Sequence, residues 1–318
     1  MSRLDPCRKP TRRSALARTA LALAAAGVLS LVMLSAAACG TSGGVGNVGD
    51  TIVGATTSTS LTDPPAHPTG SDQVVLRVTD GGGFVPVEYN LTSTPEFTLY
   101  GNGRVIVSGP VIAIYPGPAL PNLQTTIIPE EAVSSILSAA QEAGLLQNGI
   151  DYGQPSITDV STTTFVVNVG GKTYQSDVYA LGMEAGASGL TMGQQQARAT
   201  LQDFRGKLAD LTAFVSSPMS WSPYEYTSLA VYSQPVDTTA GTDSTDIMPG
   251  RLDWPLDDLS TLGAPVDPGY RRVVVTGQDL LTLQQKAPLA KANAITQWTS
   301  AGRDYHLYFR PLLPDEKS

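Results

Sequence analysis

Hydrophobic and polar residues alternate in the first part of the chain that can contribute to a core. Val74, Leu76 and Val78 share one face of an extended segment, and this period of two predicts a β-strand. Three glycines follow at residues 81–83. They lack the glycine spacing of a dinucleotide-binding loop, so we interpret them as a turn or bulge.

Further pairs of alternating segments flank glycine-containing turns, which is typical of β-hairpins. Glycine supplies the positive φ that a tight turn between twisted strands requires. Two single strands are also predicted, at 226–232 and 271–275. The predicted hairpins span residues 97–107, 164–178 and 295–309.

Apolar residues recur at steps of three and four in other segments, which predicts amphipathic helices. The first helix spans 129–144, with proline at its start and two glutamates in the turn where the helix dipole favours negative charge. The second follows an apolar stripe over 197–215 and would stop at Ser217-Pro218. A capping pattern at Thr276 indicates a shorter helix that Pro288 would end.

The order strand, hairpin, helix, hairpin, helix in the first half predicts an α+β fold. Antiparallel β-sheet hairpins would form the sheet, with the helices packed on one face. The second half repeats part of this order, which suggests two related modules, at residues 73–216 and 217–318. Chance recurrence of hairpins is the alternative to a true repeat, and the two modules can also form a single domain.

The N-terminus has the pattern of a bacterial lipoprotein signal peptide. Six basic residues precede a largely apolar stretch at 20–34. Small residues then lead to Cys39. The stretch is shorter than the roughly 20 residues that a transmembrane helix needs. We therefore interpret residues 1–38 as a cleaved signal and Cys39 as the first mature residue, lipidated on its sulfur with acyl chains such as palmitate.

The export route is not decided by this pattern. Residues 11–16 resemble a twin-arginine signal, so both the general secretory route and the twin-arginine route stay open. Either route predicts a protein anchored in the cell membrane and facing the extracytoplasmic side.

Residues 39–72 are rich in Gly, Ser, Thr and Pro and contain few large apolar side chains. Such a composition cannot bury enough surface to offset the entropy of ordering, which predicts a disordered tether. His67 falls in this segment, and we expect it to be solvated and not a metal ligand.

The net charge changes when the signal is removed. The whole chain carries −8, and residues 1–38 hold six basic residues and one acid, a net of +5, so the mature chain is near −13. This acidity excludes nucleic acid as an expected partner and leaves membrane attachment to the lipid anchor. Cys7 lies in the signal, so the mature chain has no disulfide.

Signatures of enzyme chemistry are absent from the sequence. No phosphate-binding loop, nucleophile elbow or zinc-ligand spacing occurs, and the chain has two histidines, His67 and His306. We expect His306 at a half-exposed position of the last hairpin. The sequence therefore predicts no cofactor and no bound metal.

Acidic residues are one candidate for a site. Asp151 and Asp159 bracket a loop ahead of the second hairpin, where paired carboxylates can act as acid and base or hold calcium. An aspartate in a loop also accepts backbone N–H bonds that fix a turn. Three aspartates at 237–246 lack the spacing of an EF-hand, and we interpret them as part of a solvated loop.

Aromatic residues are the other candidate. Large rings can stack on sugars or peptides at a binding surface, but they also fill the core of a domain without disulfides, which is the interpretation that the sequence favours. The aromatic residues of the second half that we consider for ligand binding are Trp221, Trp254, Trp298, Tyr305 and Tyr308.

A resemblance covers most of the predicted folded body. Residues 84–89, 97–105, 151–153, 157–159 and 310–314 resemble segments of uncharacterised actinobacterial lipoproteins. This resemblance implies a compartment and an architecture, and it implies no catalytic residue.

Two functions from different classes follow from these observations. The first is a non-enzymatic, membrane-anchored module that binds a protein or glycan of the cell envelope. The second is an extracytoplasmic hydrolase that uses the carboxylates of Asp151 and Asp159. Exposed rings would favour the binding module, and carboxylates that converge in a pocket would favour the enzyme.

Overall fold

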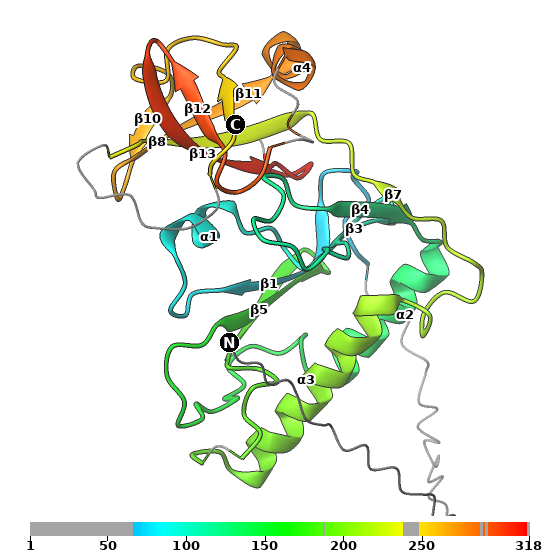
Figure 1. Ribbon diagram of the computed structural model, residues 1–318. Helices are drawn as coiled ribbons and strands as arrows, with labels where there is room; N and C mark the ends of the chain where they lie inside the picture. The colour runs from blue at the N-terminus through cyan, green and yellow to red at the C-terminus, as the bar shows by residue number, and fades with distance from the viewer. Residues whose placement is uncertain (1–65, 187, 238–247, 287–288, 290–291, 317–318) are drawn as a thin grey trace, which may run out of the picture. The chain divides into compact units, whose positions relative to one another are not determined.

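The computed structural model describes residues 66–186, 188–237, 248–286, 289 and 292–316 (Figure 1). These residues form two mainly antiparallel sheets and four helices. The predicted α+β fold with two sheet modules is therefore confirmed. All described residues belong to one compact unit.

The first sheet is built from the first half of the chain and from residues just after it. Its strand order is β6-β5-β1-β2-β3-β4-β7, with every pairing antiparallel. Its strands are β1 (Val74–Gly81), β2 (Phe97–Tyr100), β3 (Arg104–Ser108), β4 (Leu123–Ile127), β5 (Thr162–Val169), β6 (Lys172–Tyr179) and β7 (Ser222–Pro223).

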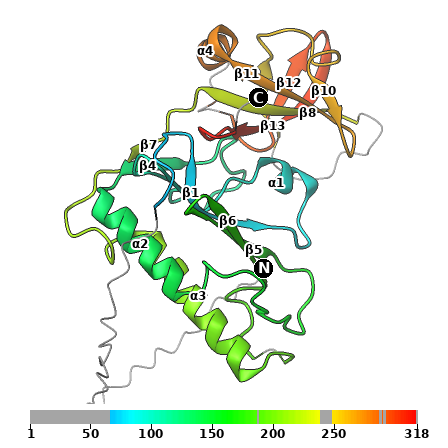
Figure 2. The same cartoon turned by 180° about the vertical axis from the view of Figure 1, so that it is seen from behind.

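Helices α2 (Glu130–Glu142) and α3 (Met192–Asp210) cover one face of the first sheet (Figure 2). Their apolar stripes share a core with the strands, as the rings of Phe165 and Phe204, 6.4 Å apart, illustrate. Helix α2 begins one residue after the predicted start, with Pro129 as its N-cap, and Gly144, with φ 83°, follows the C-cap Ala143 near the predicted end. The buried face of α2 holds Ala132, Val133, Ile136, Leu137 and Ala140.

The end predicted for α3 is wrong. The helix stops at Asp210, because Leu211 adopts a left-handed conformation with φ 58° and its N–H bonds to the carbonyl of Lys207. Leu211 and Val215 still belong to the core. The apolar stripe therefore predicted burial correctly, but a left-handed leucine gives no signal for where the helix ends.

The second sheet has strand order β10-β11-β8-β13-β12-β9, and only the β12–β9 pairing of this described sheet is parallel. Helix α4 (Gly277–Lys286) packs Leu280 and Leu283 into its core. The strands are β8 (Ser228–Pro235), β9 (Arg251–Asp253), β10 (Ala264–Val266), β11 (Tyr270–Thr276), β12 (Gln297–Ser300) and β13 (Arg303–Pro311).

All three predicted hairpins are confirmed, as β2–β3, β5–β6 and β12–β13. The two sheets nevertheless connect their hairpins differently. In the first sheet β5, the first strand of its hairpin, pairs with β1. In the second sheet β13, the second strand of its hairpin, pairs with β8. The strand orders thus do not match as an internal repeat would require.

The boundary predicted for the tether is also corrected. Residues 66–72 pack against the first sheet: the carbonyl of Ala66 accepts a bond of 2.6 Å from Gly170 N. The side chain of His67 is only 8% exposed, and its Nε2 lies 2.7 Å from Glu130 Oε1. A Cβ on Gly101 would lie 2.3 Å from the carbonyl oxygen of Pro68. The ordered body therefore includes residues that composition assigned to the tether.

Candidate binding groove

The connection between β3 and β4 exposes several large apolar side chains. Val111, Ile112, Ile114 and Tyr115 are 67%, 66%, 56% and 73% exposed. A concentration of exposed apolar surface of this kind marks an interaction site in a soluble domain. These exposed residues lie in a stretch that directly follows Pro110.

Helix α1 (Val87–Thr92) and the residues before it form a second exposed apolar segment. None of the residues of α1 is buried. Phe84 is 90% exposed and Tyr89 is 54% exposed. Helix α1 contacts β13 of the second sheet, and Figure 1 shows it on the side of that sheet that faces β1.

A cavity of about 750 Å³ joins these two segments to β13. Ligand pockets in proteins occupy about 300–1,000 Å³ and are mainly apolar, with few polar groups. We call it the apolar groove. Its lining residues are Tyr89, Thr92, Pro110, Val111, Ile112, Gly117, Pro118, Ala119, Leu120, Pro121, Asn122, Ala294, Leu307, Tyr308 and Phe309, and none of these described residues carries an ionisable acid or base other than the tyrosine hydroxyls.

Backbone hydrogen bonds fix one wall of the apolar groove. The N–H of Ala119 donates to Ala292 O at 3.1 Å, and the N–H of Ala294 donates to Gly117 O at 2.9 Å. Asn122 closes the base of the same loop, because its Nδ2 donates to Pro110 O at 2.8 Å. The wall is therefore formed before any ligand binds.

Glu88 holds α1 against the second sheet. Its carboxylate accepts a hydrogen bond of 2.6 Å from the hydroxyl of Tyr270, and this bond is the main reason that the pKa of Glu88 is lowered. Burial and then the charge of Glu88 raise the pKa of Tyr308 to about 12. Burial lowers the pKa of the nearby His306. The tyrosines are thus protonated at neutral pH and serve to position α1.

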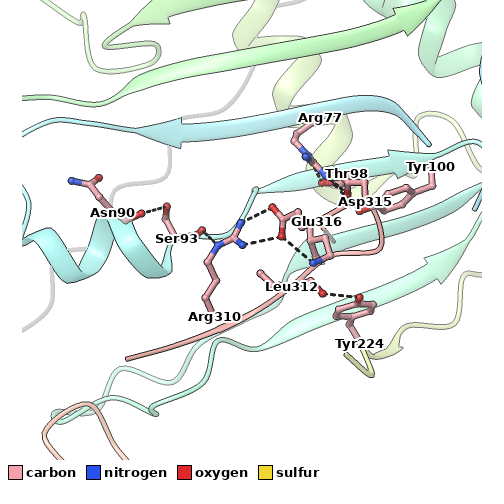
Figure 3. A network of polar contacts seen from close by, with 11 residues as sticks. Arg77, Asn90, Ser93, Thr98, Tyr100, Tyr224, Arg310, Leu312, Asp315 and Glu316 are labelled. Atoms are coloured by element: carbon pink, nitrogen blue, oxygen red, sulfur yellow. Dashed lines mark hydrogen bonds and ion pairs between the residues drawn. The ribbon is translucent and has the colours of Figure 1, made fainter. Parts of the chain in front are cut away.

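Arg310 links α1, β13 and the C-terminal residues. Its Nε donates to Ser93 O at 2.9 Å, directly after α1. Its two terminal nitrogens bind both carboxylate oxygens of Glu316, at 2.9 and 2.6 Å (Figure 3). This paired geometry fixes the planar guanidinium, so the two walls that α1 and β13 contribute are held together.

Three of the five aromatic residues considered for ligand binding lie in the core of the second sheet, which corrects that expectation for them. Trp298 is fully buried, and Tyr305 and Trp254 are 2% and 6% exposed. The ring of Trp298 packs edge-on against Trp254 at 6.3 Å and Phe309 at 5.5 Å. These rings stabilise the fold and cannot contact a ligand at the surface.

The other two aromatic residues are separated. Trp221 is 37% exposed and precedes β7 of the first sheet. Tyr308 is partly buried and lines the apolar groove. Of the five residues named from the sequence, Tyr308 is the one that the structure places at this groove.

The carboxylates of Asp151 and Asp159 are exposed, and neither lines the apolar groove. Asp151 accepts bonds from Gly153 N at 2.8 Å and from Gln194 Nε2 at 3.1 Å, the turn-fixing role that was one of its two interpretations. Asp159 has φ 63°, and its backbone carbonyl accepts the N–H of Phe84. The structure thus gives both residues local roles in loops.

The remaining candidates lie mostly outside the described residues. Cys39 does, as do Asp243 and Asp246. Among the residues that are described, no cluster of His, Cys, Asp or Glu could hold a metal ion. Within the same ranges, no helix has the length and hydropathy needed to cross a membrane.

Sequence reasoning missed the apolar groove. A signal was present, since the apolar run at 111–115 lies between Pro110 and Pro116, and prolines on both sides make a central strand unlikely to form there. An apolar run that cannot enter a sheet must either fold back into a core or stay exposed. Only the tertiary structure shows that Val111 and Ile112 of this run line a cavity together with residues of α1 and β13.

The chain was compared with known proteins. No protein-family model matches it, and no curated protein and no solved structure is similar to it.

Proposed function

We propose that this chain is a membrane-anchored extracytoplasmic lipoprotein that acts as a non-enzymatic binding module. The apolar groove is its binding surface. The observation that carries the proposal is a cavity of about 750 Å³, with apolar walls, beside exposed Val111 and Ile112. A well-formed apolar pocket with few polar groups is the default hypothesis for a binding site.

The anchor is the lipidated Cys39, and the signal pattern before it supports this part of the proposal. The resemblance to actinobacterial lipoproteins points to the same compartment. The acidic net charge of the mature chain argues against nucleic acid as a partner.

Nothing in the structure favours the hydrolase. The carboxylates of Asp151 and Asp159 would have to converge in a concave site. Asp151 is instead bonded to Gly153 and Gln194. We therefore keep one candidate function.

Binding at the apolar groove can be tested with Nile red, a neutral dye that fluoresces in apolar sites. The protein is the mature chain from residue 39 with Cys39→Ser, which removes the acyl chains. We expect saturable fluorescence that Ile112→Asp reduces and Ile127→Asp does not. The two isoleucines are a matched pair, at 66% and 68% exposed, and only Ile112 lines the apolar groove. Equal loss in both variants, or in neither, would reject the groove as the binding surface.

The anchor is tested separately by metabolic labelling of the whole chain with an alkyne analogue of palmitate in a bacterial host. Label should enter the wild type and be lost in Cys39→Ser. Label that persists in Cys39→Ser would refute lipidation at Cys39. It would not affect the proposal that the apolar groove is the binding surface.

A further inference from the structure

The chemistry of the apolar groove narrows the class of its occupant, on the premise of the proposed function. Three of the four polar side chains that line the apolar groove, all but that of the exposed Tyr89, are already engaged. Asn122 donates to Pro110 O at 2.8 Å and accepts from Gln124 at 2.6 Å. The hydroxyl of Thr92 donates to Glu88 O at 2.7 Å, and that of Tyr308 interacts with Glu88.

This engagement disfavours a peptide. A peptide brings an N–H and a C=O with every residue, and a buried polar group without a partner costs about 1–3 kcal/mol. A hydrocarbon chain brings no such group, and its burial is favourable at every methylene. The walls of the apolar groove offer mainly apolar contacts, which suit a hydrocarbon chain better than a peptide.

The size of the lining also disfavours a protein partner. A stable protein interface uses roughly 20–30 residues on each side, and the apolar groove is lined by fewer. Its volume of about 750 Å³ instead falls in the range of pockets for small ligands, about 300–1,000 Å³.

The position of the anchor in the chain makes lipid available. Cys39 lies 27 positions before Ala66, the first described residue. Even fully extended, such a length of chain spans no more than about 97 Å. An acylated Cys39 would therefore keep the apolar groove close to a bilayer.

Charge limits the head group of that lipid. None of the residues that line the apolar groove is a lysine, an arginine or a histidine, and the mature chain is near −13. An anionic head group would find no cation there and would be repelled by the protein as a whole. An uncharged head group remaining in water at the groove mouth avoids both costs.

We infer that the apolar groove binds the acyl chain of a membrane lipid with an uncharged head group. The acyl chain lies between the loop at 110–122 and residues 307–309 of β13, and Tyr89 of α1 borders it. The exposed Ile114 and Tyr115 lie in the same loop, where apolar and tyrosine side chains can contact the lipid surface from which the chain is taken.

Displacement of Nile red from the mature Cys39→Ser chain tests this inference. We expect 1-monopalmitoylglycerol, used below its micelle concentration, to displace the dye, and glycerol monoacetate to fail at a hundredfold higher concentration. These compounds share a head group and differ in chain length. Displacement by both at similar concentrations would show recognition of the head group and overturn the inference.

Palmitate tests whether the charge of the head group affects binding. It has the same chain as 1-monopalmitoylglycerol with an anionic head, and we expect it to displace the dye at least about tenfold less effectively. Palmitate of equal or greater potency would overturn the assignment of an uncharged head group.

Variants place the lipid in the apolar groove. Ile112→Asp should weaken binding of 1-monopalmitoylglycerol at least about tenfold, which corresponds to about 1.4 kcal/mol, because it replaces an apolar contact with a carboxylate. Ala294→Trp should weaken it as well by filling the cavity from its exposed side. Ile127→Asp is the matched control. A lipid affinity unchanged in both groove variants would overturn the inference.

The two proposals fail in different ways. Dye binding that depends on Ile112 but resists 1-monopalmitoylglycerol would reject the lipid and leave the binding module in place. Dye binding that is indifferent to Ile112 would reject the groove itself, and with it the proposed function.

Discussion

Arg77 and Asp315 form an ion pair between residues 238 positions apart. Arg77 Nη2 on β1 donates to Asp315 Oδ1 at 2.7 Å, and the hydroxyl of Tyr100 donates to the same oxygen at 2.7 Å (Figure 3). Asp315 follows β13 of the second sheet, whereas the other two residues belong to the first sheet. The ion pair therefore holds the residues after β13 against the first sheet, whose strand β1 lies near the start of the folded body.

We predict that Asp315→Ala lowers the free energy of unfolding by about 1.5–3 kcal/mol, the contribution of hydrogen bonds to a charged group. Arg77 and Asp315 are only 18% and 22% exposed, so solvent cannot fully replace the lost partner. Urea unfolding of the mature chain measures the effect.

The control for this variant is Asp203→Ala. The Asp203–Lys207 pair joins side chains that are 66% and 47% exposed, and an exposed pair of this kind contributes about 0.3–0.5 kcal/mol. An equal loss in the two variants would mean that Asp315 does not fasten the C-terminal residues.

The contribution of Asp315 should depend on pH. Burial acts to raise the pKa of its carboxyl, but the hydrogen bonds and charge of Arg77 together with Tyr100 outweigh burial, so that the pKa is lowered from 3.8. The unfolded chain therefore takes up the proton first as the pH falls. The stabilisation is complete above about pH 5 and is lost as the pH falls below the unfolded pKa, near 4, and through the folded pKa.

Urea unfolding at a series of pH values checks this sign. The difference between wild type and Asp315→Ala should be constant from pH 7 to about pH 5 and shrink below about pH 4. A difference that grows on acidification would contradict the assignment of a lowered pKa.

Arg198 should be among the most sensitive positions of the first module. Its side chain is fully buried beside Glu184, at 3.0 Å, and it also donates to Tyr152 O at 3.2 Å and to Tyr179 O at 2.6 Å. Arg198→Met leaves the carboxylate and two carbonyls without this donor, and we expect a loss of about 3–5 kcal/mol. Thermal and urea unfolding measure it.

The comparison for Arg198 is Lys207→Met on the same helix. Lys207 is 47% exposed, so this change should cost less than about 0.5 kcal/mol. Arg198→Lys should recover little of the loss, because an ammonium group cannot reproduce three separate N–H directions. Full stability in Arg198→Lys would show that charge alone suffices.

Alanine substitutions at two glycines can separate the cost of a left-handed backbone conformation from the cost of a steric clash at Cβ. Gly103 and Gly170 have φ of 77° and 58°. A Cβ on Gly103 would lie 2.4 Å from Ile128 O, whereas a Cβ on Gly170 meets nothing within 4 Å. Gly170→Ala should cost about 1–2 kcal/mol from the left-handed conformation alone, and Gly103→Ala should cost more. Equal melting temperatures would refute the clash at Gly103.

Local patterns predicted much of the fold because the interactions behind them are local. Glycine turns such as Gly170-Gly171 join strands that pair with each other, so the hairpins could be found from neighbouring residues. Proline at the start of α2 and Gly144 at its end act within one turn of the helix. By contrast, Leu211 ends α3 in a conformation that its residue type does not suggest.

Burial of the aromatic residues was beyond such patterns. Trp298 and Tyr305 face each other on β12 and β13, but whether that face of the hairpin meets solvent or a core depends on Trp254 and α4, which come from elsewhere in the chain. The sequence identified these rings without deciding between a surface and a core. His67 is a similar case, since composition could not show that Glu130 would lie beside it.

The sequence by itself determined the three hairpins, the positions of three helices, the acidic net charge of the chain and the signal-like pattern that ends at Cys39, because each depends on residues close together or on a sum over all of them. Tertiary structure alone decided the apolar groove. Its walls come from α1, from the loop at 110–122 and from β13, and a cavity exists only where segments distant in sequence approach without filling the space between them.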